Sequence, residues 1–182
     1  MRTRLLSTLI GASLTATVML GSLSSAAAQS PKTDVISVNL LDAIDGYFNA
    51  GWEHVLGDSW SLYLGAEVLA FRGVFDDYEG SVVALGPVLG ANLYLIGDAP
   101  QGLFLGPFVI GSWVRVSDGT NSASDFGYAF GGHIGGAALI GSFHLSAGIG
   151  AVWRAFSVDI NESDLGPRGF RPRFELSLGY AF

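Results

Sequence analysis

The sequence predicts an all-β fold: an eight-stranded antiparallel transmembrane β-barrel with up-and-down topology, preceded by an N-terminal signal peptide. Three observations lead to this prediction. The 182-residue chain is 49% hydrophobic and only 14% charged, whereas the surface of a water-soluble domain carries about 25–35% charged residues. Apolar residues alternate with polar or small ones along most of the chain, which is the pattern of strands. Short and long connections alternate between these segments, as in outer-membrane barrels.

The N-terminus has the pattern of a secretory signal peptide. Arg2 and Arg4 precede an uncharged stretch, residues 5–23, and a run of small residues ends at Ala28. We expect cleavage after Ala28, so that residues 1–28 are the signal peptide and residues 29–182 form the barrel domain. The alternative is an uncleaved membrane anchor. A signal peptide followed by a transmembrane β-barrel predicts a location in the bacterial cell outer membrane.

Two long uncharged windows, residues 80–97 and 126–153, have the length of transmembrane helices. The second window holds eight glycines, and each glycine costs about 1 kcal/mol relative to alanine inside a helix. Positive charge does not flank either window, and both keep the two-residue alternation. These windows are therefore predicted to be strands.

Eight strands follow in order along the mature chain. The last is the clearest, because every second residue from Phe170 to Phe182 is bulky and apolar, apart from Pro172. The first is the least regular, because residues 39–42 (Asn-Leu-Leu-Asp) break the alternation; a short amphipathic helix is the alternative there. Whether residues 35–45 form a full first strand stays open. The predicted strands lie near 35–42, 46–56, 60–73, 81–96, 103–116, 126–140, 143–156 and 170–182.

The alternation also predicts which face of the sheet is outside. One row of side chains is bulky and apolar, and the other is dominated by Gly, Ser, Ala and a few ionisable groups. The interior of an eight-stranded barrel is just wide enough to be filled by side chains, so the small and ionisable row fits inside. The bulky row then faces lipid. The alternative is a secreted lipocalin-like barrel, which places its apolar row inside.

The inward ionisable residues are predicted to form a polar network that plugs the barrel. Unpaired buried charges are costly, so we expect ion pairs, with Glu67 and Glu175 against Arg173 as the central set. A plugged interior predicts no steady ion conductance; the alternative is a proton or ion path. The predicted network comprises Glu53, Glu67, Arg115, His133, His144, Arg154, Arg171, Arg173 and Glu175.

Composition excludes several classes of function. The formal net charge of −7 argues against a nucleic-acid partner, which requires a basic face. The absence of Cys excludes disulfides, cysteine-based zinc sites and thiol catalysis. No phosphate-binding glycine loop and no EF-hand spacing is present. We therefore expect no cofactor and no metal.

The loops between the predicted strands are acidic, and their carboxylates are predicted to be solvated. Two arginines, Arg72 and Arg168, border the predicted outer rim, where each is positioned to contact the phosphates of lipopolysaccharide. The loop acids are Asp42, Asp45, Asp76, Asp77, Glu79, Asp118, Asp125, Asp159, Glu162 and Asp164.

The C-terminal segment resembles the last strand of bacterial outer-membrane barrels, which ends in an aromatic residue after alternating apolar positions. The matching positions are Phe174, Leu176, Leu178, Tyr180 and Phe182. The resemblance implies recognition by the barrel-assembly machinery.

The mature chain as a whole is similar to small outer-membrane barrels grouped with the opacity and OmpA-like transmembrane domains. Residues 39–43 and 102–106 resemble patterns of an uncharacterised branch of that group. The chain departs from full-length OmpA-like proteins because no peptidoglycan-binding domain follows the barrel. A role in tethering the cell wall is therefore not expected.

The pair His144 and Ser146 resembles the His-x-Ser pair of lipid A deacylases. A serine nucleophile needs a base, an orienting acid and access to its ester, whereas this pair is predicted to point into the barrel. We therefore expect a non-enzymatic protein with a structural, envelope-integrity or surface-interaction role. Its expected partners are outer-membrane lipid and lipopolysaccharide, and its oligomeric state stays open. The alternatives are a loop-mediated adhesion or ligand-binding module and a lipid A-modifying enzyme.

Overall fold

The computed structural model describes residues 32–42, 46–75, 78–117, 120–155, 158–160, 163–165 and 168–182. The predicted signal peptide, residues 1–28, lies outside the described residues. All regular secondary structure in the described part is β, and none of it is a helix long and apolar enough to cross a membrane.

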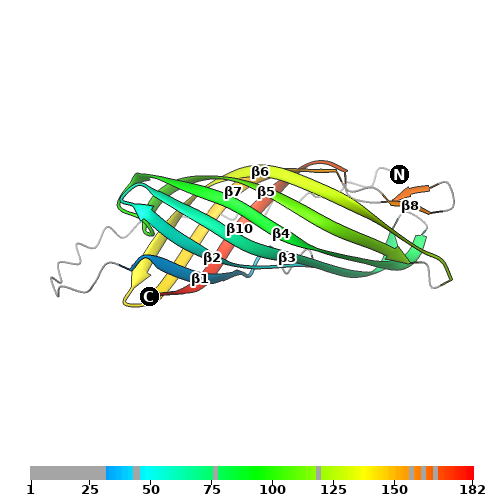
Figure 1. Cartoon of the computed structure of the whole chain (residues 1–182), viewed down its shortest axis with the longest axis horizontal. Helices are drawn as coiled ribbons and strands as arrows, with labels where there is room; N and C mark the ends of the chain where they lie inside the picture. Colours follow the sequence, from blue (N-terminus) through cyan, green and yellow to red (C-terminus); the bar gives the residue numbers. More distant parts are fainter. Residues whose placement is uncertain are drawn as a thin grey trace, which may run out of the picture. The chain divides into compact units, whose positions relative to one another are not determined.

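Eight of the strands close into one antiparallel barrel in the order β1-β10-β7-β6-β5-β4-β3-β2 (Figure 1). Each strand pairs with its neighbour along the chain, and β10 closes the ring on β1. The predicted eight-stranded up-and-down barrel is confirmed as a fold. The bounds are β1 Asp34–Asn39, β2 Tyr47–Gly57, β3 Trp60–Phe75, β4 Tyr78–Ile96, β5 Gly102–Ser117, β6 Ser122–Ile140, β7 Phe143–Ala155, β8 Val158–Ile160, β9 Ser163–Leu165 and β10 Arg168–Ala181.

The first strand is shorter than predicted: residues 34–39 form a strand rather than a helix, and residues 40–42 lie beyond its end. The rest of the segment in question, residues 43–45, lies outside the described residues. Residues 34–39 pair with β2 on one side and with β10 on the other. The strand ends at Asn39, whose Oδ1 accepts hydrogen bonds from the backbone N–H of Leu41 (3.0 Å) and of Leu176 (3.4 Å). An asparagine side chain that binds nearby backbone groups competes with the ladder, and this explains why the alternation stops at Asn39.

Strands β8 and β9 were not predicted. They pair with each other as a separate two-stranded sheet inside the segment that the sequence analysis assigned to one long loop. Each is only three residues long, which is too short for a two-residue alternation to be recognised.

Three short turns lie at one end of the barrel, here called the short-turn end, at residues 58–59, 97–101 and 141–142. Gly97 and Gly141 occupy the left-handed region, with φ of 87° and 66°, which only glycine adopts without strain. These tight turns hold consecutive strands in register and therefore set which side chains face inward.

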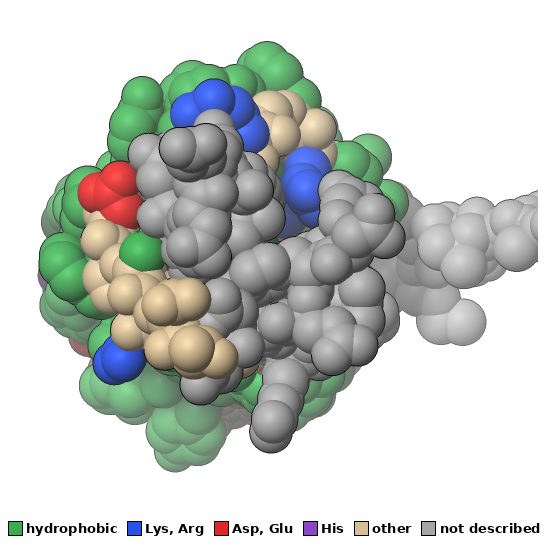
Figure 2. Space-filling view, turned by 90° about the vertical axis from the view of Figure 1, so that its right-hand side faces the viewer, with side chains coloured by type: hydrophobic (Ala, Val, Ile, Leu, Met, Phe, Trp, Pro, Cys, Tyr) green, Lys and Arg blue, Asp and Glu red, His purple; other side chains and the backbone are tan. Residues whose placement is uncertain are grey.

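The outer surface of the barrel is apolar. Thirty large hydrophobic side chains among the described residues are exposed. Trp113 and Phe170, for example, are 60% and 76% exposed. Figure 2 shows hydrophobic side chains around the periphery of the barrel, seen from the end opposite the short turns. The predicted outward direction of the bulky row is confirmed, with exceptions on β5 described below.

The interior is filled in two different ways. Polar side chains gather toward the short-turn end, whereas a buried apolar cluster lies mainly between β4 and β5. From the sequence we expected an interior of small and ionisable residues, and this cluster was not predicted. Its buried members are Leu69, Val82, Ala84, Val88, Phe108, Ile110, Val114, Val116, Ala129 and Val152.

Candidate functional site

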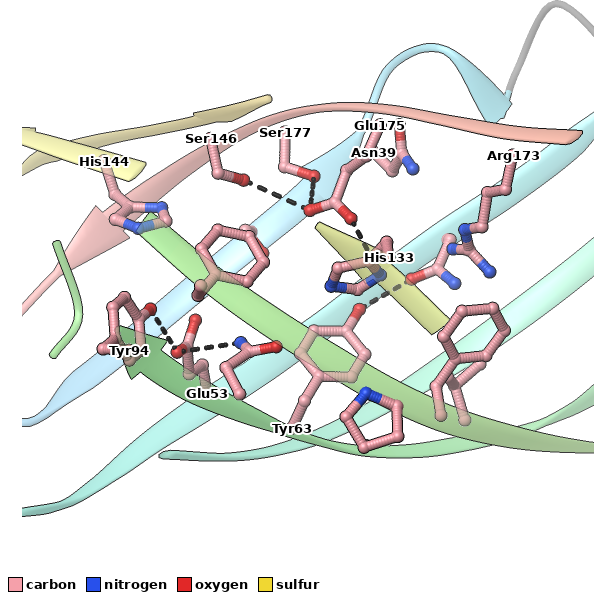
Figure 3. A pocket seen from close by; sticks show the side chains of 18 residues that line it. Asn39, Glu53, Tyr63, Tyr94, His133, His144, Ser146, Arg173, Glu175 and Ser177 are labelled. Carbon is pink, nitrogen blue, oxygen red and sulfur yellow. Dashed lines mark hydrogen bonds and ion pairs between the residues drawn. The ribbon is translucent and has the colours of Figure 1, made fainter. Parts of the chain in front are cut away.

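The candidate site is a polar chamber inside the barrel (Figure 3). Its centre is a cavity of about 50 Å³ lined by residues of all eight barrel strands, among them Glu53, Tyr63, His133 and Glu175. A buried water needs about 10–15 Å³, so the cavity has room for about three or four waters. It is far too small for a substrate of ordinary size.

Glu53 is a deeply buried carboxylate that is held by neutral donors. It is 6% exposed. Its Oε1 accepts hydrogen bonds from Ser61 Oγ, from Tyr94 Oη at 2.8 Å and from Asn92 Nδ2 at 3.1 Å. Several hydrogen bonds to one carboxylate offset much of the cost of removing it from water. Three neutral side chains therefore hold the Glu53 carboxylate in place.

Glu175 organises a second cluster around His133. Its Oε1 accepts hydrogen bonds from Ser146 Oγ (3.2 Å) and Ser177 Oγ (3.3 Å), and its Oε2 lies 3.5 Å from His133 Nδ1 (Figure 3). The His133 ring packs edge-on against Phe104 and stacks on Phe108. These contacts fix the imidazole between two aromatic rings and leave it one acidic neighbour.

The strongest ion pair joins Glu67 and Arg154. Two hydrogen bonds of 2.8 and 3.2 Å connect the guanidinium to the two carboxylate oxygens, and the side chains are only 3% and 7% exposed. The guanidinium also lies 4.3 Å from the ring centroid of Tyr47. A buried bidentate pair of this kind is directional and orients both walls of the barrel.

Arg173 and Asp42 form a third pair, with 3.1 Å between Nη2 and Oδ2. Arg173 also lies over the Phe108 ring at 4.5 Å. Burial raises the pKa of Asp42 to about 6, although Arg173 opposes this effect. The prediction that Asp42 is a solvated loop charge is therefore wrong: the residue turns inward beyond the end of β1 and is 13% exposed.

The predicted central set of Glu67 and Glu175 against Arg173 does not form. Glu67 pairs with Arg154, and Arg173 pairs with Asp42. The central set was predicted by counting residues along each strand from its short turn, which gives an approximate level of each side chain in the barrel. In a barrel the strands tilt and are staggered in register, so residues on opposite walls meet at levels that such counting does not give.

One member of the predicted network faces the wrong way. Arg115 lies in the outward row of β5, is exposed and donates a hydrogen bond to Ser122 Oγ (3.3 Å). On β5 both rows are apolar, with Trp113 outside and Val114 and Val116 inside. The hydrophobicity of β5 therefore does not indicate which of its two rows faces inward. The inward prediction for Arg115 depended on its charge alone.

Arg171 and His144 follow the predicted parity. Arg171 shares the inner row of β10 with Arg173 but is exposed, because it lies near the end of the barrel. His144 is 2% exposed, and its Nε2 lies 3.1 Å from the carbonyl oxygen of Pro100.

The structure gives His144 and Ser146 different partners. Ser146 donates to Glu175, whereas His144 contacts the backbone of Pro100. A serine nucleophile is activated by a base within hydrogen-bond reach, and here the residue that meets the hydroxyl is a carboxylate. Within the described residues no group of three or more acidic or histidine side chains is arranged to hold a metal ion.

Five side chains of the chamber carry a buried polar atom with no protein hydrogen-bond partner in the described part of the chain. All five line the cavity. Atoms of this kind are typically satisfied by buried water, so the chamber has the character of a hydrated plug. The residues are Asn39, Asn49, His133, His144 and Arg173.

Sequence reasoning missed the neutral members of the chamber. Tyr63 donates to Asn49 Oδ1 at 2.6 Å, and Tyr94 and Asn92 bind Glu53. Asn49 and Tyr63 lie in the row that was predicted to be inward, so their polarity was the available signal. Asn92 and Tyr94 lie on β4, where both rows are largely apolar.

The predicted assembly signal at the C-terminus lies on the outer row of β10, and one of the two predicted rim arginines is described. Phe174 and Tyr180 are exposed on the outer row of β10, and the terminal Phe182 follows the strand. Leu176 and Leu178 lie in the same row and are half-buried. Arg168 is exposed at the start of β10, whereas the side chain of Arg72 lies outside the described part.

Comparison of the chain with models of protein families, with curated proteins and with solved structures finds no match.

Proposed function

We propose that the protein is a small integral β-barrel of the bacterial outer membrane, with a plugged polar interior and a non-enzymatic structural role in the envelope. The observation that carries the proposal is the reversed polarity of the barrel. Exposed Phe, Trp, Leu and Ile side chains cover the outside, while buried ion pairs such as Glu67–Arg154 lie inside. A water-soluble barrel would have the opposite arrangement.

Backbone pairing supports the same proposal. In a bilayer each unsatisfied backbone group costs several kcal/mol, so a sheet that crosses the membrane must close. The ring of eight paired strands meets this requirement along most of its circumference. The exposed apolar end of β10, with Phe174, Tyr180 and Phe182, supports assembly by the barrel-assembly machinery.

The small chamber supports a plug rather than a pore or an enzyme. Among the described residues, a cavity of about 50 Å³ holds only a few waters, which is much less than the water column of a pore. We expect no steady single-channel steps from the purified protein in planar bilayers. We also expect the lipid A mass spectrum to stay unchanged on overexpression. Loss of an acyl chain that Ser146→Ala abolishes would instead identify an enzyme.

The direct experiment compares unboiled and boiled samples of a purified outer-membrane fraction on SDS gels. A closed barrel resists detergent and migrates differently before and after boiling, and the mature protein should begin at Gln29. Recovery of the protein in the soluble periplasm, with no mobility shift, would overturn the proposal.

A further inference from the structure

Strand β10 is paired on both sides over only part of its length. On the β1 side, pairing runs from Ala181 to Ser177 and ends with a hydrogen bond from Leu40 N–H to Leu176 O. On the β7 side, pairing continues to Arg168. Within the described residues, positions 168–175 of β10 therefore have a strand on one side alone. We call these eight residues the open edge.

The opposite border of this opening is also unpaired in the described part. Strand β3 pairs with β2 only up to Leu69, with one further hydrogen bond from Ala70 N–H to Gly46 O. Above that level it pairs with β4 alone.

The sequence of the open edge disfavours addition of another strand. Leu176 turns its backbone toward β1, and alternate residues of an antiparallel strand do the same. Phe174, Pro172 and Phe170 therefore turn their backbone groups toward the open side. Proline has no N–H, and natural edge strands use it to block pairing. Pro172 lies near the centre of the open edge, so pairing with a further strand is disfavoured there.

The side chains of the open edge are amphiphilic. Phe170 and Phe174 are 76% and 58% exposed in the outer row. Arg171 is exposed in the inner row, and Arg173 lies beside it on the same face. Three of the nine basic residues of the chain fall between positions 168 and 173, in a protein of net charge −7. Figure 2 shows basic side chains at this end of the barrel next to hydrophobic ones.

We infer that the open edge of β10 binds a membrane lipid with a phosphate headgroup. Arg171 donates to the phosphate oxygens, since the guanidinium matches the geometry of phosphate. An acyl chain lies along Phe170, Pro172 and Phe174. The inference rests on the proposed membrane location and adds a ligand class and a site to it. The occupant is a lipid because an exposed arginine of the inner row and exposed apolar side chains of the outer row meet at the same edge of β10.

The test measures lipid selectivity at one tryptophan. Trp153 of β7 pairs with Phe170 of the open edge. The full mature chain, with its other tryptophans replaced by Phe, is refolded into phosphatidylcholine vesicles that contain brominated phosphatidylglycerol or brominated phosphatidylcholine. We expect the anionic lipid to quench Trp153 with about fivefold higher relative affinity, the effect of one arginine near a lipid phosphate.

Two controls localise the effect. Arg171→Gln should remove the preference, whereas Arg115→Gln, which changes an exposed arginine on β5, should leave it intact. A chain that retains only Trp60, on β3 at the short-turn end, should show no preference. Equal quenching of Trp153 by both lipids, or equal losses in the two arginine variants, would overturn the inference.

A free-anion arm separates the two sources of phosphate. Inorganic phosphate at 50-fold excess over the lipid headgroup should leave the quenching unchanged, because it lacks the chain that contacts Phe170 and Phe174. Complete displacement by inorganic phosphate would overturn the lipid assignment. The mobility shift of the refolded protein is measured in every sample, so that failure of the barrel proposal is distinguished from failure of the lipid site.

Discussion

The two halves of the barrel interior solve the same packing problem with different chemistry. Toward the short-turn end, buried polar groups such as Glu53 and Glu175 are held by hydrogen bonds. Between β4 and β5, Ile110, Val114 and Val116 are each no more than 2% exposed and pack as an ordinary core. The polar half depends on matched partners, and the apolar half depends on filled volume.

The two kinds of packing should differ in how much a mutation lowers the free energy of unfolding. Removal of one partner from a buried ion pair leaves an uncompensated charge, which is more costly than a missing methyl group. Removal of an apolar side chain leaves a cavity whose cost depends on how far the walls relax. Mutations that break a buried ion pair, such as Glu67–Arg154 beside the apolar cluster, should therefore be rescued by a second mutation, whereas those that open an apolar cavity should not.

The largest effect is expected for Glu67→Ala. The variant leaves the Arg154 guanidinium without its bidentate carboxylate, so the free energy of unfolding should fall by about 3–5 kcal/mol. Urea unfolding of the barrel refolded in vesicles measures the change. The double variant Glu67→Ala/Arg154→Met should recover more than half of the loss. A single variant within 1 kcal/mol of the wild type would contradict the assigned role of the pair.

In the apolar half, Ile110→Ala should cost about 3 kcal/mol, because it opens a cavity among the side chains of β4 and β5. The same urea assay applies. Val109→Ala is the matched control, since Val109 is the neighbouring residue on the exposed row and no cavity opens there. Equal losses in the two variants would mean that the inside and outside of β5 are not distinguished as described.

A smaller effect concerns pH. The pKa of Asp42 is raised to about 6, so the folded protein binds this proton more tightly than the unfolded chain. The contribution is fully present below about pH 3.8 and is lost as the pH rises through 6, on the order of 2–3 kcal/mol. Asp42→Asn should flatten this part of the stability profile. An identical slope in both proteins between pH 4 and 6 would exclude the assignment.

The smallest effect is expected for Arg115→Gln. The residue is exposed on the outer row, and surface substitutions of this kind change stability by no more than about 0.5 kcal/mol. The same substitution at Arg154 should be strongly destabilising, because it breaks the buried pair with Glu67. Thermal or urea unfolding of the two variants side by side tests which arginine belongs to the interior.

Much of the fold was predictable because strands carry a local signal. The alternation from Phe143 to Trp153 identifies both the strand and its inner face without any knowledge of the neighbours. The short turns at Gly97 and Gly141 are local as well. The break at Asn39 was visible, but not its cause, because the partner of the Asn39 side chain, Leu176, is more than a hundred positions away in sequence.

The sequence predicted most of the charged residues that line or surround the candidate site, but it did not predict which of them contact one another. Glu53, Glu67 and Glu175 were recognised as inward because each interrupts an otherwise small or apolar row. Their partners were not, because strand tilt and register decide which walls meet. The inward prediction for Arg115 was wrong because β5 is apolar on both faces, so its sequence does not indicate which row points inward.

By itself, the sequence determined the number of barrel strands, their order and the outward direction of the bulky row, since these follow from period and turn chemistry between near neighbours. Only the tertiary structure decided that Glu67 meets Arg154, that Asp42 turns inward to Arg173, and that β10 keeps an open edge. The physical reason is that closing a barrel joins residues far apart in the chain, with a stagger that no local pattern records.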